Sequence, residues 1–388
     1  MIHLGLAGTF LLGIVQILTW GGSFFLIAIL GGPIIRDTGW SPRWVYGALS
    51  VGILVSGLLS PLCGRLINRY GGRQLLGWSG IVIAAGLSVM ALTDNLAVFI
   101  AAWGVIGVGM AMGLYDPLFA VLGSLYGHEA RQAISRITLI SGFCTTLVWP
   151  ALSFLVALLG WRHAVLVYAA LLVVGVFPVY ARILPDTVGP KEAATGNTAT
   201  GAPLDAGLYA LMTAVFSIAA VIMTAMSAHL IALLQGQGYT AAAAVGIGAL
   251  IGPSAVASRI VEVLGKKRHP AVTTMISVLL AAAGLFLMAL WPVAAAFGVV
   301  MYSAGNGLRA IVRGTLPLAV VPSGSYAVVM GRMARPVLVG QAATPMAGGY
   351  VLERFGAATM LWCLCSLAIL NVLLVWVLRR RISAGSPE

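Results

Sequence analysis

The sequence predicts an all-α integral membrane protein whose twelve transmembrane helices form two six-helix pseudo-repeats. Three observations lead to this fold class. The chain of 388 residues is 60% hydrophobic and only 8% charged, with a mean hydropathy of +1.02, which excludes a set of soluble domains. Its apolar runs reach the roughly 20 residues that a helix needs to cross the hydrocarbon of a bilayer. Features of the first half also recur in the second half at an offset of 194 residues, half the chain length.

Cutting the chain at its polar and Gly/Pro-containing turns gives the twelve apolar runs. They cover residues 8–31, 44–64, 74–93, 96–118, 134–158, 163–183, 207–234, 241–264, 270–290, 293–318, 326–350 and 356–378. Residues 184–206, between the sixth and seventh runs, are rich in small and polar residues, which is typical of a flexible connector. The predicted organisation is an N-terminal bundle (1–183), a cytoplasmic linker (184–206) and a C-terminal bundle (207–388).

The distribution of lysine and arginine predicts the orientation. If the N-terminus is cytoplasmic, most of these residues fall in the inside connections, and the outside connections hold only Arg36, Arg43, Arg162 and Arg354. Because positive charge is retained on the cytoplasmic side, both termini are expected in the cytoplasm, at a bacterial inner (plasma) membrane. The basic residues are spread over turns, so the formal charge of +12 does not indicate a nucleic-acid partner.

A basic stretch, Gly64 to Arg73, joins the second and third runs. It recurs 194 residues later, where Arg65 corresponds to Arg259 and Gly71 to Gly265. Its arginines require water or lipid headgroups around them. The stretch is therefore expected to be a short polar turn at the membrane surface.

This stretch resembles, in register, the signature G-x-L-x-D-R-x-G-R-R/K of the major facilitator superfamily. The matching residues are Gly64, Leu66, Arg69, Gly71 and Arg73. One position departs, because Asn68 stands where the family has aspartate and so lacks the charge. The resemblance implies two halves around a cavity near the midplane, lined by helices one, four, seven and ten. It also implies a cytoplasmic conformational latch, for which we expect these residues: Gly64, Asn68, Arg69, Gly71, Arg73, Arg259 and Glu262.

A polar stripe on the tenth run is the leading candidate for the substrate site. Tyr302, Asn306, Arg309 and Arg313 share one helical face. A charge inside the membrane costs at least about 2.5–3.5 kcal/mol on insertion scales, so it calls for a function. The planar fork of arginine suits a carboxylate or another oxyanion, and we expect Arg309 to bind one with Tyr302 and Asn306. Alternatively, Arg309 pairs with an acid and Arg313 snorkels to the interface.

The first and fourth runs supply further candidates for substrate binding. Gln16 and Trp20 lie on one face of the first run with Ser23, and Trp20 either stacks on a substrate or packs against a neighbouring helix. Tyr115 in the fourth run is the repeat mate of Arg309. We include Gln16, Trp20 and Tyr115 in the predicted substrate site.

Two residues are candidates for proton coupling. Asp116 follows Tyr115, and a partly desolvated carboxylate can take up a proton during transport. Otherwise it is the structural partner of an arginine or a helix-end group before Pro117. His229 in the seventh run titrates near physiological pH, or it is a hydrogen-bonded histidine near the interface.

Two shorter patterns resemble branches of the superfamily. Helix eleven carries a series of small residues and proline that is similar to the antiporter signature of drug-exporting members: Gly331, Gly340, Thr344, Pro345, Gly348 and Gly349. Those members carry it in helix five, the repeat mate of helix eleven. The segment from Tyr126 to Arg131, followed by Gly142, resembles the helix-four-to-five region of monocarboxylate and oxalate/formate transporters.

Other chemistries lack their motifs. The sequence contains no GxxxxGKS/T phosphate loop and no HExxH, and its four cysteines have no metal-ligand spacing. We therefore expect no enzyme, no cofactor and no metal, and an ion or substrate gradient as the energy source. The predicted function is a monomeric, proton-coupled secondary active transporter of a small carboxylate-like organic anion. The alternative is proton-driven efflux of drugs or amphiphilic metabolites, and a membrane sensor or enzyme subunit is a third possibility.

Overall fold

The computed structural model describes residues 5–70, 72–126, 130–185, 205–264, 269–320 and 326–384. Within these ranges the chain is helical apart from short connections, and no strand occurs there, so the predicted all-α fold is confirmed. Two compact units divide the chain, one of Met1–Ala193 with Pro345–Tyr350 and one of Ala194–Thr344 with Val351–Glu388. The predicted bundle limits, 1–183 and 207–388, stay a prediction, as does the linker, of which residues 186–204 lie outside the described ranges.

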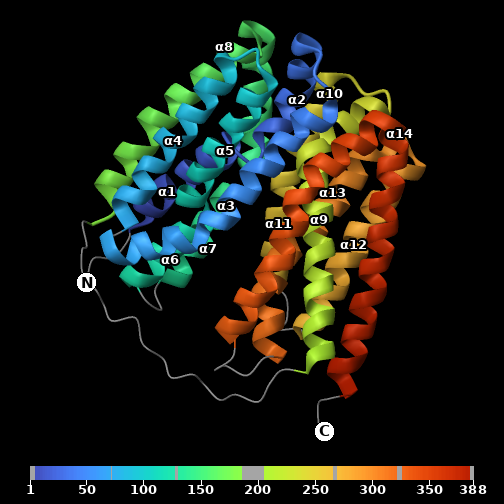
Figure 1. Ribbon diagram of the computed structural model, residues 1–388. Helices are drawn as coiled ribbons and strands as arrows, with labels where there is room; N and C mark the ends of the chain where they lie inside the picture. The colour runs from blue at the N-terminus through green and yellow to red at the C-terminus, as the bar shows by residue number, and fades with distance from the viewer. Residues whose placement is uncertain are drawn as a thin grey trace. The chain divides into compact units, whose positions relative to one another are not determined.

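In the described residues of the first unit, the chain forms the helices α1 to α8, coloured blue to green in Figure 1. They are α1 (Leu6–Gly21), α2 (Leu26–Thr38), α3 (Pro42–Tyr70), α4 (Gly72–Leu92), α5 (Leu96–Gly113), α6 (Tyr115–Tyr126), α7 (Ala130–Ser141) and α8 (Cys144–Ile183). Helix α4 packs against α5 and α8, α3 packs against α5, and α1 packs against α7 and α8. Buried aromatic and aliphatic side chains fill the spaces between them.

The first predicted run, 8–31, is interrupted and too short. Helix α1 ends at Gly21, and α2 continues to Thr38, so Arg36 lies in the last turn of α2 and not in a connection. A Cβ atom at Gly22 would come within 2.7 Å of the Tyr168 ring of α8. Glycine thus permits the close helix contact while weakening the helix at this point. Helix α2 ends at Gly39, whose φ of 69° suits a glycine C-cap.

Two further runs of the first unit are interrupted where a continuous helix was predicted. The fourth run divides at Leu114, which has extended backbone angles (φ −74°, ψ −169°) between α5 and α6. The fifth run divides between α7 and α8, at residues 142–143. Interruptions of this kind leave backbone carbonyls without their usual helical partners, and these groups need other donors.

The predicted turn between the second and third runs is much shorter than expected. Helix α3 continues through Asn68 and Arg69 to Tyr70, and α4 begins at Gly72. Most of the basic stretch from Gly64 to Arg73 is therefore helical. No glycine or proline lies between Gly64 and Gly71 to end the helix, and long arginine side chains can reach water from a helix end.

The second unit contains the remaining helices, coloured yellow to red in Figure 1. They are α9 (Ala206–Gly236), α10 (Ala241–Ala249), α11 (Ile251–Leu264), α12 (Pro270–Leu290), the short 3-10 helix η2 (Pro292–Ala294), α13 (Ala295–Val320) and α14 (Tyr326–Ala384). Helix α13 packs along α12 and α11. Met212, Phe216, Val312 and Leu378 belong to an apolar core that joins α9, α12, α13 and α14.

The two units share a structural landmark that supports the repeat. Helix α8 changes direction at Gly160 (φ 77°, ψ 161°), and α14 does so at Gly356 (φ 80°, ψ 177°). These backbone angles are essentially restricted to glycine. Gly160 lies between the predicted runs 134–158 and 163–183, and Gly356 is the first residue of the predicted run 356–378, so a turn of the same kind is made at similar places in both halves.

Nine segments within the described ranges have the length and hydropathy needed to cross a membrane. Two of them, Ala133–Ile183 and Pro336–Ser383, are 51 and 48 residues long and contain Gly160 and Gly356. Helix α13, which carries Arg309 and Arg313, is not among the nine. The twelve predicted crossings therefore require that the two long segments each cross twice and that α13 also crosses.

Candidate substrate site

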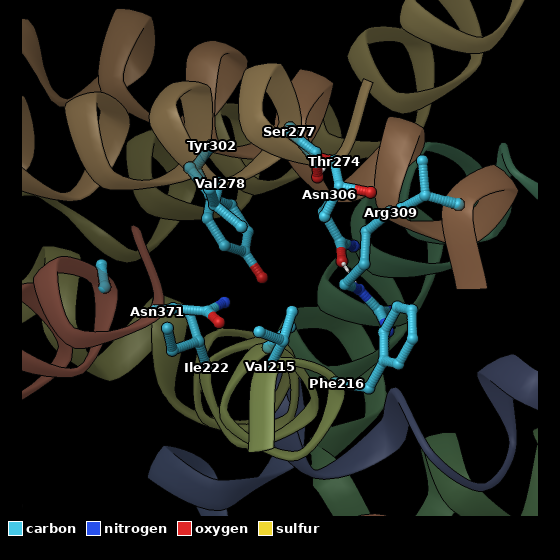
Figure 2. A pocket seen from close by; sticks show the side chains of 15 residues that line it. Val215, Phe216, Ile222, Thr274, Ser277, Val278, Tyr302, Asn306, Arg309 and Asn371 are labelled. Atoms are coloured by element: carbon cyan, nitrogen blue, oxygen red, sulfur yellow. Dashed lines mark hydrogen bonds between the residues drawn. The ribbon is translucent and has the colours of Figure 1, made fainter. Parts of the chain in front are cut away.

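The hollow that contains most of the predicted polar stripe lies within the second unit (Figure 2). It is lined by α9, α12, α13 and α14 and encloses about 490 Å³ of space outside protein atoms, its open side included. Its walls are mainly apolar, with Val215, Phe216, Ile222, Val278 and Val312 among them. The polar side chains that line it are Thr274, Ser277, Tyr302, Asn306, Arg309 and Asn371. An apolar hollow with a few polar groups is the usual form of a small-molecule site.

Arg309 is held within this hollow by a neighbour on its own helix. Its Nε donates to Asn306 Oδ1 at 2.8 Å, a contact between residues three positions apart. Its Nη2 contacts the sulfur of Met223 on α9 at 2.7 Å, and a thioether is a weak acceptor without charge. Among the described residues of the second unit, no carboxylate lies within ion-pair distance of Arg309. The guanidinium is therefore oriented by Asn306, and neither of its two contacts is to a charged group.

Tyr302 and Asn371 supply polar groups elsewhere in the hollow. Each residue is only 3% exposed, and Figure 2 shows both side chains pointing into the hollow, Tyr302 from α13 and Asn371 from α14. Neither the Tyr302 hydroxyl nor Asn371 Oδ1 has a hydrogen-bond partner among the described residues. By contrast, Ser277 donates to the Gly305 carbonyl at 2.7 Å, so its hydroxyl is already satisfied.

Sequence reasoning missed Asn371. It carries the only amide side chain in the predicted run 356–378, and a polar group within an apolar span was the signal that could have identified it. The predicted polar stripe also included one residue, Arg313, that lies outside the hollow. Arg313 is exposed and does not line the hollow, because it lies one turn beyond Arg309.

In the first unit, Gln16 is a fully buried link between three elements. Its Nε2 donates to the Gly113 carbonyl at 2.8 Å and to the Tyr180 hydroxyl at 3.1 Å. Its Oε1 accepts from Trp20 Nε1 at 3.1 Å. The interruption at Leu114 explains the first contact, since it leaves the Gly113 carbonyl to be satisfied from outside the helix. Gln16 and Trp20 are thus brought together as predicted, but the amide is occupied by internal partners.

An aromatic group surrounds the interruptions in the first unit, and we call it the aromatic cluster: Trp20, Phe24, Phe25, Tyr115 and Phe119. The Trp20 ring lies 4.9 Å from that of Tyr115, which stacks on Phe119 at 5.1 Å. The Tyr115 hydroxyl is 2.6 Å from Ser141 Oγ. Trp20 and Tyr115 remain partly exposed. The Trp20 ring therefore packs against neighbouring aromatic rings and also keeps accessible surface on which a substrate could stack.

The two proton-coupling candidates have opposite surroundings. Asp116 lies in the first turn of α6, directly after the Leu114 interruption, and is exposed. It forms no hydrogen bond or ion pair to another described residue of the first unit. His229 is fully buried in α9. They belong to different units.

The predicted latch residues of the second unit, Arg259 and Glu262, form hydrogen bonds from α11 to neighbouring helices. Arg259 Nε donates to the Gly307 carbonyl of α13 at 3.3 Å, and Glu262 Oε1 accepts from Thr273 Oγ1 of α12 at 2.6 Å. In the first unit, Gly64 lies in α3 with open space beside it, and Arg73 is partly exposed in α4. The Asn68 and Arg69 side chains and all of Gly71 lie outside the described residues.

These features define a multi-pass membrane protein with a partly polar hollow. The family model of the Major Facilitator Superfamily matches residues 12–334, and the chain belongs to this superfamily of transporters. The predicted family is therefore confirmed.

Individual relatives are more distant. The chain is 32% identical over 130 residues to monocarboxylate transporter 14 of Homo sapiens, covering 33% of this chain and 24% of that one. It is 26% identical over 159 residues to monocarboxylate transporter 6 of Homo sapiens, covering 39% and 30%. The matched stretches thus span about a quarter to a third of these relatives.

Solved structures share the fold over nearly the whole chain. The nucleoside transporter NupG superimposes with a TM-score of 0.77 at 11% identity, covering 96% of this chain and 99% of that one. A D-xylose–proton symporter gives 0.75 at 13% identity, covering 95% and 97%. At such identities the likeness establishes the fold and not the substrate.

Proposed function

We propose that this transporter carries small organic anions by alternating access and that Arg309 binds their carboxylate. The observation that carries this proposal is an arginine oriented by Asn306, lining an apolar hollow, with no carboxylate partner among the described residues of its unit. An uncompensated cation in such surroundings is costly, and a bound anion offsets that cost. The matches to monocarboxylate transporters support the same substrate class.

We further propose that transport is coupled to protons through Asp116, with His229 as a second candidate. The exposed position of Asp116 beside a helix interruption supports access by water and a change of protonation during the cycle. The name of the D-xylose–proton symporter shows that this fold serves proton-coupled transport elsewhere. The proposed setting is a bacterial inner membrane with both termini in the cytoplasm, where the latch residues would face the cytoplasm.

Uptake by purified protein in proteoliposomes tests the role of Arg309. Arg309→Gln and Arg309→Lys should reduce uptake of every carried carboxylate, the first by at least about tenfold, because a hydrogen bond to a charged group contributes roughly 1.5–3 kcal/mol. Lysine keeps the charge but loses the planar fork. Arg313→Gln is the matched control, since Arg313 lies on the same helix outside the hollow. Unchanged uptake by both Arg309 variants would refute the proposal.

The aromatic cluster favours a second candidate function, the export of amphiphilic compounds. The partly exposed rings of Trp20, Phe25 and Tyr115 suit flat apolar cargo and, through cation–π attraction, cationic cargo. Sensitivity of a deletion strain to lipophilic cations, compared with its growth on carboxylates, separates the two functions. Resistance that depends on Trp20 and not on Arg309 would favour export.

A further inference from the structure

We propose that the hollow of the second unit also recognises a hydroxyl group on the substrate, so that its preferred anions are carboxylates with a hydroxyl several carbon atoms away. The proposal rests on the role of Arg309 given above and adds a second polar contact, made by Tyr302 and Asn371. The Tyr302 hydroxyl and Asn371 Oδ1 form no hydrogen bond within the part of the chain that the structure describes. The inference therefore concerns what these two side chains bind.

The burial of the two groups is the first step. Tyr302 and Asn371 are each 97% buried, with exposed fractions of 3%, and the Tyr302 hydroxyl and Asn371 Oδ1 have no partner among the described residues. Buried polar atoms in native proteins are nearly always hydrogen-bonded, to protein, water or ligand. Because both side chains point into one hollow (Figure 2), the hollow is where the missing partner would lie.

The chemistry of the two atoms selects the partner. A tyrosine hydroxyl donates a hydrogen bond, and an amide oxygen only accepts one. A group that accepts from Tyr302 and donates to Asn371 satisfies both atoms at once. An alcohol hydroxyl does this. A carboxylate could accept from the Tyr302 hydroxyl and from Asn371 Nδ2, but it would leave Asn371 Oδ1 without a donor.

The spacing along α13 sets the separation of the two polar ends. Tyr302 and Arg309 are seven residues apart on this helix, which corresponds to about 10 Å along its axis. Apolar side chains such as Val215, Ile222 and Val278 line the same hollow. A ligand that reaches from Arg309 to Tyr302 therefore needs an apolar middle, as in a linear ω-hydroxy acid.

Binding measurements on the purified full-length protein test this with hexanoate and ω-hydroxyhexanoate as probes. For the unmodified protein we expect the hydroxylated acid to bind about tenfold more tightly, the effect of two neutral hydrogen bonds. Tyr302→Phe and Asn371→Leu should each reduce this ratio to about threefold or less. Ser303→Ala is the control, because the Ser303 hydroxyl is also buried and has no hydrogen-bond partner in the described ranges, but Ser303 does not line the hollow. The affinity ratio of this variant should stay near tenfold.

Arg309→Gln separates a failure of this inference from a failure of the proposed function. If it weakens both probes while the two acids bind equally to the unmodified protein, an ordered water occupies the polar end, and the hydroxyl inference is wrong although carboxylate binding stands. The hydroxyl inference is also wrong if Tyr302→Phe and Asn371→Leu both leave the affinity ratio of ω-hydroxyhexanoate to hexanoate unchanged. If Arg309→Gln alters the affinity of neither probe, the proposed function itself is wrong.

Discussion

Asn306 accepts a hydrogen bond from the Arg309 guanidinium at 2.8 Å, one turn away on the same helix. The contact fixes the guanidinium without cancelling its charge, because an amide is neutral. The contact uses only Nε of the guanidinium. The two terminal nitrogens, of which Nη2 contacts the Met223 sulfur, can still donate to a ligand. Asn306 is thus a positioning residue for the proposed anion site.

Replacing Asn306 with aspartate should be more harmful than replacing it with alanine. Asn306→Ala loosens Arg309 and should raise KM for carboxylates by about threefold to tenfold. Asn306→Asp places a carboxylate against the guanidinium, which then pairs internally and competes with the substrate, so uptake should fall further. Initial rates over a range of substrate concentrations measure both effects. If the aspartate variant transports as well as the alanine variant, the anion does not bind at Arg309.

Asp116→Asn should separate substrate movement from the proton gradient. The amide cannot exchange a proton, so an imposed inward proton gradient should no longer stimulate uptake, while exchange of labelled for unlabelled substrate continues. Proteoliposomes with and without the gradient provide the measurement. Asp205→Asn is the control, because Asp205 caps α9 and asparagine caps helices equally well. Persistent stimulation in Asp116→Asn would exclude Asp116 and leave His229 as the candidate.

Gln16 is expected to behave as a structural residue, contrary to the sequence-based hypothesis that it binds substrate. Gln16→Leu leaves the Gly113 carbonyl and Tyr180 hydroxyl without their donor, and should lower the free energy of unfolding by roughly 1–3 kcal/mol. Gln16→Glu should cost at least as much, since a carboxylate cannot donate to the Gly113 carbonyl. Thermal unfolding in detergent measures this. A change in substrate KM at unaltered stability would instead support direct binding.

Arg162 ties together three elements at one end of the first unit. Its Nη1 donates to the carbonyls of Ala91 and Thr93 at 2.9 and 3.0 Å, and its Nη2 lies 2.6 Å from Asp94 and 3.4 Å from Asp37. Arg162→Ala should destabilise the protein by about 1–3 kcal/mol. Arg162→Lys should recover only part of this, because an ammonium cannot reproduce the fork.

Arg36→Ala is the matched control for Arg162, since Arg36 is an exposed arginine of α2. Its replacement should change the melting temperature little. Equal melting temperatures for Arg162→Ala and Arg36→Ala would show that the contacts of Arg162 contribute nothing measurable.

Alanine at Gly160 or Gly356 should destabilise the turn between two helices. Both glycines have φ near +80° with extended ψ, where a Cβ costs about 1–3 kcal/mol. Gly246→Ala is the control, because Gly246 lies in α10 with open space and an ordinary φ, and alanine favours helices. In thermal unfolding, Gly246→Ala should therefore have a higher melting temperature than Gly160→Ala and Gly356→Ala. A stability of Gly160→Ala equal to that of Gly246→Ala would contradict this account.

Hydrophobic run length was sufficient to predict the all-α class and the approximate place of most helices, and the resemblance of the stretch from Gly64 to Arg73 to the superfamily signature predicted the family. The interruptions at Gly22 and Leu114 were not predicted, although Gly21, Gly22 and Pro117 stand beside them, because the length of the apolar runs was given more weight than these local helix-weakening residues. The basic stretch was read as a turn because its charge was weighed more heavily than its lack of a helix breaker. Arginines in the last turns of a helix can also reach water or lipid headgroups with their long side chains, so the charge did not require a turn.

The candidate site was predicted only along one helix. Periodicity placed Tyr302, Asn306 and Arg309 on one face, and all three line the hollow. Periodicity within a helix cannot reveal which residues of other helices complete a site, so Asn371 and Met223 were missed. It also could not show that Arg313 lies beyond the hollow or that the Gln16 amide is already occupied.

The carbonyls of Gly113 and Gly307, which correspond under the 194-residue offset, each accept from a side chain of a different helix: the neutral Gln16 amide in one half and the cationic Arg259 guanidinium in the other. At both positions a Cβ atom would collide with a serine, Ser79 or Ser258. The two corresponding positions thus meet the same requirement by unlike chemistry. The Arg259 bond is longer, at 3.3 Å against 2.8 Å, and Arg259 is partly exposed whereas Gln16 is fully buried. Water can therefore compete more readily for the bond in the second half, and the halves need not flex alike.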